Sequence, residues 1–149
     1  MVNLLQQLEQ KLATYQAEEI NSPLPEAAVL LPVTTSSNNP ELILTRRALH
    51  LSSHPGQVGF PGGKKDPEDK NLYQTALRES QEEIGLAEQL VKPLGQLSDV
   101  ISLHGIKVRP YVGLVPDDLK FTPCPDELDA VFKVPLDWLL EDPRSHTDV

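Results

Sequence analysis

Cysteine, basic residues and long apolar runs are all scarce in this sequence, and each shortage argues against a class of protein. Cys124 is the single cysteine, so an internal disulfide is impossible and a reducing, cytoplasmic location is expected. Lys and Arg number 13 against 22 Asp and Glu, and the formal net charge is -9. Because binding along a nucleic-acid backbone needs a basic surface, we expect no nucleic-acid partner.

No stretch of the sequence approaches the length of a membrane-spanning helix, and residues 1–7 lack the basic start and apolar run of a signal peptide. We therefore expect no membrane partner. With 149 residues, 39% of them hydrophobic, the sequence can bury one core, so residues 1–149 are expected to form a single domain. Such a domain is expected to be a monomer or a homodimer.

Apolar spacing and turn residues predict the order of the secondary structure. Leucines at helical spacing predict an N-terminal helix within residues 1–20, from an N-cap at Asn3 to about Glu18. Two apolar runs around a polar turn predict a hairpin whose far end carries Arg46 and Arg47. The expected strands span residues 27–33, 41–45, 91–102, 106–115 and 127–134, a loop spans 48–59, and a short helix spans 135–140. Helices covering a mixed sheet, an α/β fold, are therefore predicted.

The chain is organised around a glycine-rich turn at residues 60–63 and the carboxylate-rich helix that follows it. Glu79, Glu82 and Glu83 occupy positions i, i+3 and i+4, so three carboxylates crowd one side of this helix. A separate, mostly apolar side can pack inward. Hard oxygen ligands in this number suit Mg²⁺ or Mn²⁺ and not zinc, so the stretch predicts a metal and phosphate site.

Neighbouring residues narrow this interpretation. An acidic helix side, taken alone, is more often a solvated face than a metal site. Here the pair Gly62-Gly63 precedes the helix and lets a backbone carbonyl approach as a further ligand. Arg78 lies four residues before Glu82 and can hold that carboxylate in one rotamer. Gly85 ends the helix as a typical C-terminal cap, and the combination favours the metal site.

Residues 78–86 resemble the second half of the Nudix box, R-E-U-x-E-E-x-G-U with U apolar, and Ser80 stands at the first U position. The first half departs from the box, because Asp69 replaces its Glu and eight residues, not seven, separate Asp69 from Arg78. Asp69 is therefore left out of the metal set. The resemblance implies a Nudix hydrolase, an α/β/α sandwich with a mixed β-sheet flanked by helices, which cleaves small nucleoside diphosphate derivatives with Mg²⁺ or Mn²⁺. It makes Arg78 the organiser of three metal ligands, Glu79, Glu82 and Glu83.

Residues 43–63 resemble the motif of coenzyme A diphosphatases, L-L-T-x-R-S/A-x-x-x-R-x-x-x-G-x-x-x-F-P-G-G. Ile43 replaces the first Leu, and Ser52 stands where the motif has its second Arg, a natural partner for the 3′-phosphate of coenzyme A. Arg47 matches the first motif Arg and is the strongest expected substrate contact, whereas His50 and His54 are weaker ones. The two motifs cover residues 42–86. The predicted substrate-binding residues are Arg46, Arg47, Gly56, Phe60, Gly62 and Gly63, and Gly63 is also a predicted metal ligand.

Outside these motifs, Glu127 enters an expected strand at a position where Nudix hydrolases often have a general base or a further metal ligand. A solvent-exposed acid is an equally good interpretation, and Asp99 and Asp126 are weaker candidates for the same role. Trp138 is expected in the core. The sequence ends soon after the expected final helix, whereas coenzyme A diphosphatases usually continue, so the resemblance implies either a truncated chain or a shortened relative.

Three functions remain open from the sequence. The first is metal-dependent hydrolysis of coenzyme A or acyl-coenzyme A to 4′-phosphopantetheine and adenosine 3′,5′-bisphosphate. The second is hydrolysis of ADP-ribose or another nucleotide sugar, which the missing Arg at position 52 keeps open. The third is a noncatalytic nucleotide-binding module, against which the intact box glutamates argue.

Overall fold

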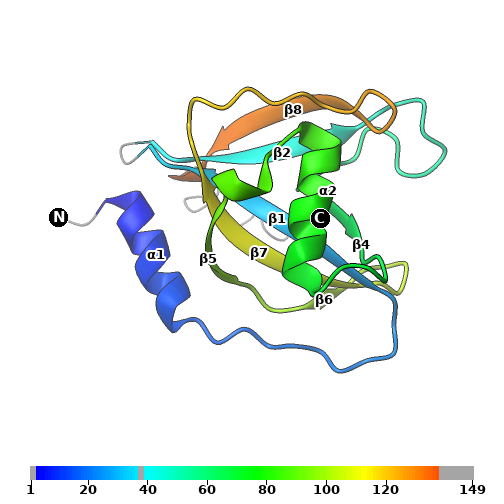
Figure 1. Ribbon diagram of the computed structural model, residues 1–149, viewed down its shortest axis with the longest axis horizontal. Coiled ribbons are helices and arrows are strands. Elements are labelled where there is room, and N and C mark those ends of the chain that lie inside the picture. Colours follow the sequence, from blue (N-terminus) through cyan, green and yellow to red (C-terminus); the bar gives the residue numbers. More distant parts are fainter. Residues whose placement is uncertain (1–2, 37–38, 138–149) are drawn as a thin grey trace.

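The computed structural model describes residues 3–36 and 39–137. In these two ranges no helix combines the length and the apolar character needed to cross a bilayer. The elements, in chain order, are helix α1 (Leu4–Thr14), strands β1 (Glu26–Thr34), β2 (Glu41–Arg47), β3 (Val58–Gly59) and β4 (Gly62–Lys64), helix α2 (Leu72–Ile84), the 3₁₀ turn η1 (Glu88–Leu90), and strands β5 (Lys92–Gln96), β6 (Val100–Ile101), β7 (Lys107–Val115) and β8 (Leu128–Pro135) (Figure 1).

The strands form one mixed sheet in the order β3-β2-β1-β7-β5, with β4 added on β1, β6 on β7 and β8 on β2. β1 and β7 run parallel along their whole length, from Glu26 opposite Lys107 to Thr34 opposite Val115. The other pairs are antiparallel. Parallel neighbours cannot be joined by a tight turn, so the connection between β1 and β7 is long and holds β2, β3, β4, α2, η1, β5 and β6.

β1 and β2 form the predicted hairpin, but they stay together only briefly. Their one residue pair is Val33 with Leu42, close to the connecting turn. Further along, β3 pairs with β2 at Thr45, and β4 pairs with β1 around Ala28. The two long strands therefore diverge, and two short strands occupy the edges that become free. The glycine-rich segment predicted as a turn is thus strand β4, because its backbone bonds to β1.

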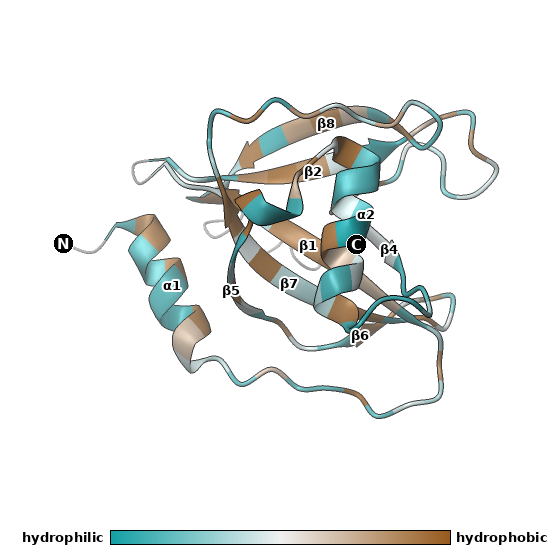
Figure 2. Ribbon diagram, in the orientation of Figure 1, coloured by the Kyte–Doolittle hydropathy of each residue, from teal (hydrophilic) through white to brown (hydrophobic). Residues whose placement is uncertain are grey.

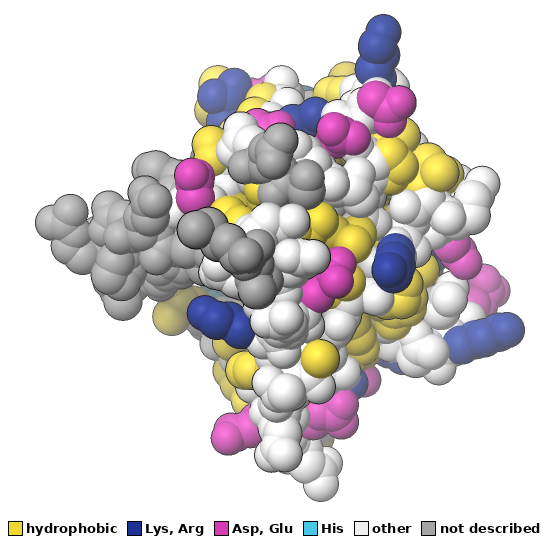
Figure 3. All heavy atoms as spheres, turned by 90° about the vertical axis from the view of Figure 1, so that its left-hand side faces the viewer, with side chains coloured by type: hydrophobic (Ala, Val, Ile, Leu, Met, Phe, Trp, Pro, Cys, Tyr) yellow, Lys and Arg dark blue, Asp and Glu magenta, His cyan; other side chains and the backbone are white. Residues whose placement is uncertain are grey.

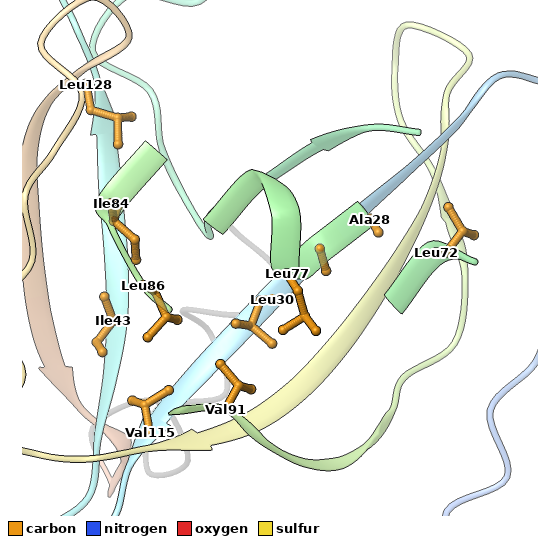
Figure 4. Close-up of a cluster of buried hydrophobic side chains, with 11 residues drawn as sticks. Ala28, Leu30, Ile43, Leu72, Leu77, Ile84, Leu86, Val91, Val115 and Leu128 are labelled. Atoms are coloured by element: carbon orange, nitrogen blue, oxygen red, sulfur yellow. The ribbon is translucent and has the colours of Figure 1, made fainter. Parts of the chain in front are cut away.

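Alternate residues of β1 and β7 pack into two cores on opposite faces of the sheet, as expected for a pleated strand. Ala28 and Leu30 of β1 and Val115 of β7 join the core beneath α2 (Figure 4). Val33 of β1 and Leu114 of β7 join the core beneath α1. Helices thus cover both faces of a mixed sheet, and the predicted α/β/α sandwich is confirmed.

Helix α2 is capped at both ends, and one of its sides is buried. Asn71 caps its start by accepting the Gln74 amide at 2.9 Å, and Gly85 ends it with a left-handed φ of 73°. Ser80, on the side predicted to face inward, is fully buried, and its hydroxyl donates to the Ala76 carbonyl. Figure 2 shows the hydrophilic residues of α2 turned away from the brown strands beneath it.

Helix α1 begins at the predicted cap, where Asn3 and Gln6 form a reciprocal capping box. It ends at Thr14 and not near Glu18, because the following segment is hydrogen-bonded to Ser98 and Asp99, between β5 and β6. In that segment the Ile20 amide donates to Asp99 at 2.8 Å. The face that carries α1 has charges of both signs among apolar side chains (Figure 3).

Two further predictions need correction or lie beyond the description. The strand expected over residues 91–102 is two strands, β5 and β6, because Asp99 turns to bind the N-terminal segment. Pro135 is the last residue of β8, and the helix expected over residues 135–140 begins after it, with Leu136 and Asp137 helical. Trp138, with the remainder of that helix, lies outside the described residues.

Candidate active site

A cavity of about 630 Å³ lies where β1 and β2 diverge. Strands supply its sides, through residues such as Thr45 of β2 and Gly62 of β4. Helix α2 supplies Glu79 and Glu83, and the segment before β8 supplies Glu127. The divergence of two strands, which only the sheet pairing reveals, therefore creates the space, and three carboxylates border it.

Glu83 is the most buried of these carboxylates, with 7% of the residue exposed. The Gly62 amide donates to its Oε1 at 3.1 Å. Burial raises the pKa of Glu83 to about 7, and the negative charges of Glu79 and Glu127 add to the rise, against the opposing Gly62 amide and the charge of Arg47. A buried carboxylate whose charged form is disfavoured gains from a nearby cation, so Glu83 fits a metal ligand.

Glu79 is half-buried, and burial raises its pKa as well, although Arg78 opposes this shift. Its carboxylate lies directly over the Gly63 backbone: a Cβ atom at position 63 would stand 2.6 Å from Glu79 Cδ. Glycine is required here because the carboxylate fills the space of a side chain. This close approach joins β4 and α2 on one side of the cavity, which we call the helix wall: Gly62, Gly63, Glu79 and Glu83.

Arg78 lies behind the helix wall and donates hydrogen bonds to several acidic side chains. Its Nε and Nη2 donate to both oxygens of Asp69 at 3.0 Å each, and its Nη1 reaches Glu79 at 3.1 Å and Glu82 at 3.2 Å. The Arg78 to Glu82 contact predicted from the spacing is therefore present. Nη2 also donates to the Lys64 carbonyl at 3.2 Å, so Arg78 ties α2 to β4.

Asp69, which the sequence analysis left out of the metal set, is a main partner of Arg78. Beyond its two bonds from Arg78, it accepts the Thr75 hydroxyl at 2.9 Å and the Asp66 amide at 2.8 Å. The bond from Arg78, ahead of those from Asp66 and Thr75, holds the Asp69 pKa well below its usual range although burial opposes the shift. Its position in the sequence could have identified it, because this acidic residue stands where the Nudix box has its first Glu.

Glu82 does not line the cavity, and its side chain is 57% exposed beside Arg78. Throughout residues 3–36 and 39–137, no three Asp, Glu, His or Cys side chains are gathered into a metal cluster. The three glutamates predicted as one ligand set therefore divide: Glu79 and Glu83 face the cavity, and Glu82 stays with Arg78. The hard oxygen donors at the cavity still fit a divalent cation, with Glu127 as the third nearby carboxylate.

Glu127 reaches the cavity because the segment before β8 is fastened to the end of α2. The Cys124 amide donates to the Glu83 carbonyl at 2.8 Å, and the Glu127 amide donates to the Cys124 carbonyl at 3.0 Å. Asp99, by contrast, is bound by Arg109 at 2.8 Å away from the cavity, and Asp126 does not line it. Of the three acids considered outside the box, geometry favours Glu127.

The substrate motif contributes a second side of the cavity, which we call the loop wall: Arg47 and residues 48–57. Arg47 lines the cavity, but its Nε and Nη2 donate to the carbonyl and hydroxyl of Ser53 at 3.1 and 3.3 Å. Gly56 does not line the cavity; its amide closes the loop on the Arg47 carbonyl at 3.0 Å. Ser53 thus holds the arginine that was predicted to bind substrate.

Some of the remaining predicted contacts line the cavity and others do not. Phe60, Gly62 and Gly63 line the cavity, and their role as substrate contacts stays a prediction. Arg46 does not: its Nε donates to Asp129 of β8 at 2.7 Å, so its role as a substrate contact stays a prediction. Lys64, which sequence reasoning passed over, also lines the cavity. Its position directly after the glycine pair could have identified it from the sequence.

Comparisons with known proteins agree with this geometry. The family model described as NUDIX domain matches residues 24–148. A protein named uncharacterized Nudix hydrolase NudL from Yersinia enterocolitica is 48% identical over 110 residues, covering 74% of this chain and 56% of that protein. The protein of the same name from Yersinia pestis is 46% identical over 121 residues, covering 81% and 60%. The chain thus spans somewhat under two thirds of the length of these relatives.

Solved structures share the fold at lower identity. The Ap4A hydrolase binary complex from C. elegans superimposes with a TM-score of 0.64 at 16% identity, covering 79% of this chain and 85% of that one. The NUDIX domain of Shewanella oneidensis NrtR, complexed with ADP ribose, gives 0.61 at 21% identity, covering 90% and 86%. Since the family model spans most of the chain and the Yersinia relatives share nearly half of the aligned residues, this protein belongs to the Nudix hydrolase family.

Proposed function

We propose that this protein hydrolyses the diphosphate bond of coenzyme A or of its acyl derivatives, using Mg²⁺ or Mn²⁺. The observation that carries the proposal is the meeting of two motifs at one cavity. Arg47, Phe60 and Gly63 of the coenzyme A-type motif line the same space as Glu79 and Glu83 of the Nudix box. Residues that recognise the substrate and residues that cleave its diphosphate can therefore contact the same bound molecule.

Hydrolysis brings a nucleophile to a phosphorus that already carries negative oxygens. A divalent cation, which Nudix hydrolases generally use, neutralises those oxygens when bound and lowers the pKa of a coordinated water. Glu79 and Glu83 would hold it through carboxylate oxygens, and the Gly63 carbonyl would be a further donor. Glu82 joins this set only by giving up its pairing with Arg78.

Glu127 is the proposed general base, because it borders the cavity and is joined through Cys124 to the backbone of Glu83. Its carboxylate takes one proton from water as the water oxygen bonds to one phosphorus. The bond from that phosphorus to the bridging oxygen breaks, the bridging oxygen leaves with the second phosphate, and the proton passes to solvent. The products are 4′-phosphopantetheine and adenosine 3′,5′-bisphosphate. Arg47 and Lys64 supply positive charge for phosphate oxygens.

A nucleotide sugar such as ADP-ribose is the second candidate substrate. Ser52 stands where the coenzyme A-type motif has an Arg, so one expected partner of the 3′-phosphate is missing. The structural neighbour from Shewanella oneidensis was solved with ADP ribose. A noncatalytic nucleotide-binding module is the third candidate.

The deciding experiment offers the purified protein coenzyme A, its dephospho form and ADP-ribose with Mg²⁺, and identifies products by mass spectrometry. We expect cleavage of coenzyme A to the two products named above, faster than cleavage of the dephospho form. Equal rates for these two would undercut a contact to the 3′-phosphate, and faster turnover of ADP-ribose would favour the second candidate. Tight binding without any turnover would establish the third.

A further inference from the structure

A second, smaller cavity of about 350 Å³ adjoins the active-site cavity where β4 ends. Its sides come from the start of β1 and from the segment that follows β4, which lie next to each other because β4 pairs with β1 (Figure 1). Lys64 lines both cavities. The other residues of the second cavity are Leu24, Pro25, Glu26, Lys65, Asp66 and Pro67. A molecule bound at the active-site carboxylates can therefore extend past Lys64 into this space.

The sheet register places Lys64 on the cavity face of β4. Lys64 is opposite Ala27 of β1, and opposed residues of neighbouring strands share a face. Ala27 shares that face with Val29, which lines the active-site cavity. A Cβ at the preceding residue, Gly63, would point at Glu79. Because successive residues of a strand alternate between faces, the Lys64 side chain leaves β4 on the side opposite Glu79.

The charges of the second cavity are unevenly paired. Its two acids already have cationic partners: Glu26 binds Lys107 at 3.0 Å, and Asp66 lies 3.7 Å from Arg78. Within the part of the chain that the structure describes, neither lysine of this cavity forms an ion pair with an acidic side chain. In a chain of net charge -9, these two neighbouring cations are available to an anionic ligand.

We infer that Lys64 and Lys65 bind a phosphate monoester that the substrate carries on its ribose, beside the diphosphate that is cleaved. The inference rests on the proposed function and assigns residues to its specificity. Two compact lysine charges suit a phosphate monoester, which carries close to two negative charges at neutral pH. The side chains of Leu24, Pro25 and Pro67 give the cavity apolar sides, as is usual in sites for small organic ligands.

This assignment accounts for a departure in the loop wall. Ser52 stands where the coenzyme A-type motif has its second Arg, so the loop wall lacks one expected charge for a phosphate. Lys64 and Lys65 supply positive charge from β4 and the residue after it. In coenzyme A a single ribose joins the diphosphate at its 5′ position to a phosphate at its 3′ position. The two groups therefore need adjoining sites, and the two cavities that share Lys64 provide them.

The first test measures specificity as a ratio, in which a general loss of activity cancels. Kinetics with Mg²⁺ gives kcat/KM for coenzyme A and for its dephospho form. We expect a ratio of about tenfold in the wild type and of about one in the double variant Lys64→Gln/Lys65→Gln. Lys64→Arg/Lys65→Arg keeps both charges and should keep most of the preference. Lys70→Gln is the matched control, because Lys70 is exposed and lines neither cavity.

The second test needs no turnover. Calorimetry in the presence of a chelator compares adenosine 5′-phosphate with adenosine 3′,5′-bisphosphate and adenosine 2′,5′-bisphosphate. We expect the 3′-phosphate to improve affinity by about tenfold in the wild type and in Lys70→Gln, and by little in the double glutamine variant. A gain from the 2′-phosphate alone, lost in the same double variant, would support the lysine site and reject coenzyme A as the source of its phosphate.

The outcomes separate this inference from the proposed function. Cleavage of coenzyme A with a wild-type ratio of one, or with a preference that the double glutamine variant retains, would overturn the inference alone. Absence of any affinity gain from either added phosphate would overturn it as well. Failure to cleave both coenzyme A compounds would overturn the proposed function, and the calorimetry would still decide whether the two lysines bind the added phosphate.

Discussion

The helix wall and the loop wall border the same cavity but are held in different ways. On the helix wall, Glu83 is buried, Glu79 presses on the Gly63 backbone, and Arg78 binds four acidic or carbonyl partners behind them. The loop wall is mostly exposed, and the hydrogen bonds of the Arg47 side chain within the described residues go to Ser53. The groups proposed for chemistry are therefore more buried and have more hydrogen-bond partners than the arginine proposed for recognition.

The largest effect is expected from Glu83→Gln on the helix wall. The amide keeps the shape of the side chain but removes the charge that would hold a cation, so kcat should fall by about 10²- to 10⁴-fold. The thermal midpoint should change little, because burial already disfavours the charged form of this carboxylate. Steady-state kinetics and thermal unfolding measure the two quantities. A variant with full activity would reject the role of Glu83.

Gly63→Ala is expected to have the next largest effect. The added Cβ would lie 2.6 Å from the Glu79 carboxyl carbon and must displace it, which should lower kcat by about 10- to 100-fold. Gly59→Ala is the matched control, because a Cβ at Gly59 meets no atom within 4 Å. Equal losses in the two variants would show that the cavity side is sensitive to any added methyl group, and would remove the argument from Glu79.

Asp69→Asn tests whether Arg78 needs a charged partner to keep the helix wall in place. The paired hydrogen bonds weaken, so we expect the free energy of unfolding to fall by about 1–2 kcal/mol and kcat by about tenfold. Denaturant unfolding and kinetics measure these changes. The exposed neighbour Glu68→Gln is the control and should change neither.

The same aspartate predicts how stability depends on pH. Since the folded-state pKa of Asp69 is depressed, its contribution is complete above the unfolded value of about 3.9 and is lost as pH falls further toward the folded value. The wild-type advantage over Asp69→Asn should therefore shrink when unfolding is measured at decreasing pH below about 4. An advantage that stays constant over this range would contradict the assignment.

The smallest effect is expected from Ser53→Ala on the loop wall. The variant removes one of the two Ser53 contacts to Arg47, the one from the hydroxyl, and keeps the carbonyl contact. We expect KM to rise by roughly threefold with kcat unchanged, as for loss of one long, solvent-exposed hydrogen bond in binding. Ser52→Ala is the control. A fall in kcat would mean that the loop wall also positions reacting groups, and the distinction between the walls would fail.

Much of the fold follows from local patterns in the sequence. Asn3 and Gly85 act as the predicted caps, and leucines at helical spacing form α1. The strand positions are close to those predicted, because apolar runs between turn residues mark them in the sequence. The breaks were harder to predict: the division of β5 from β6 depends on Asp99 binding a segment about eighty residues earlier in the chain.

Local sequence patterns likewise predicted some features of the candidate site, and only the tertiary structure revealed the others. Local spacing alone determines that Glu79, Glu82 and Glu83 share one helix and that Arg78 reaches Glu82, because a helix has a fixed number of residues per turn. Tertiary structure decided which glutamates face the cavity, that Asp69 binds Arg78 together with Glu79 and Glu82, and that Glu127 joins them. Those outcomes depend on strand pairings and backbone bonds between distant segments, and above all on the divergence of β1 and β2, which no local pattern of residues encodes.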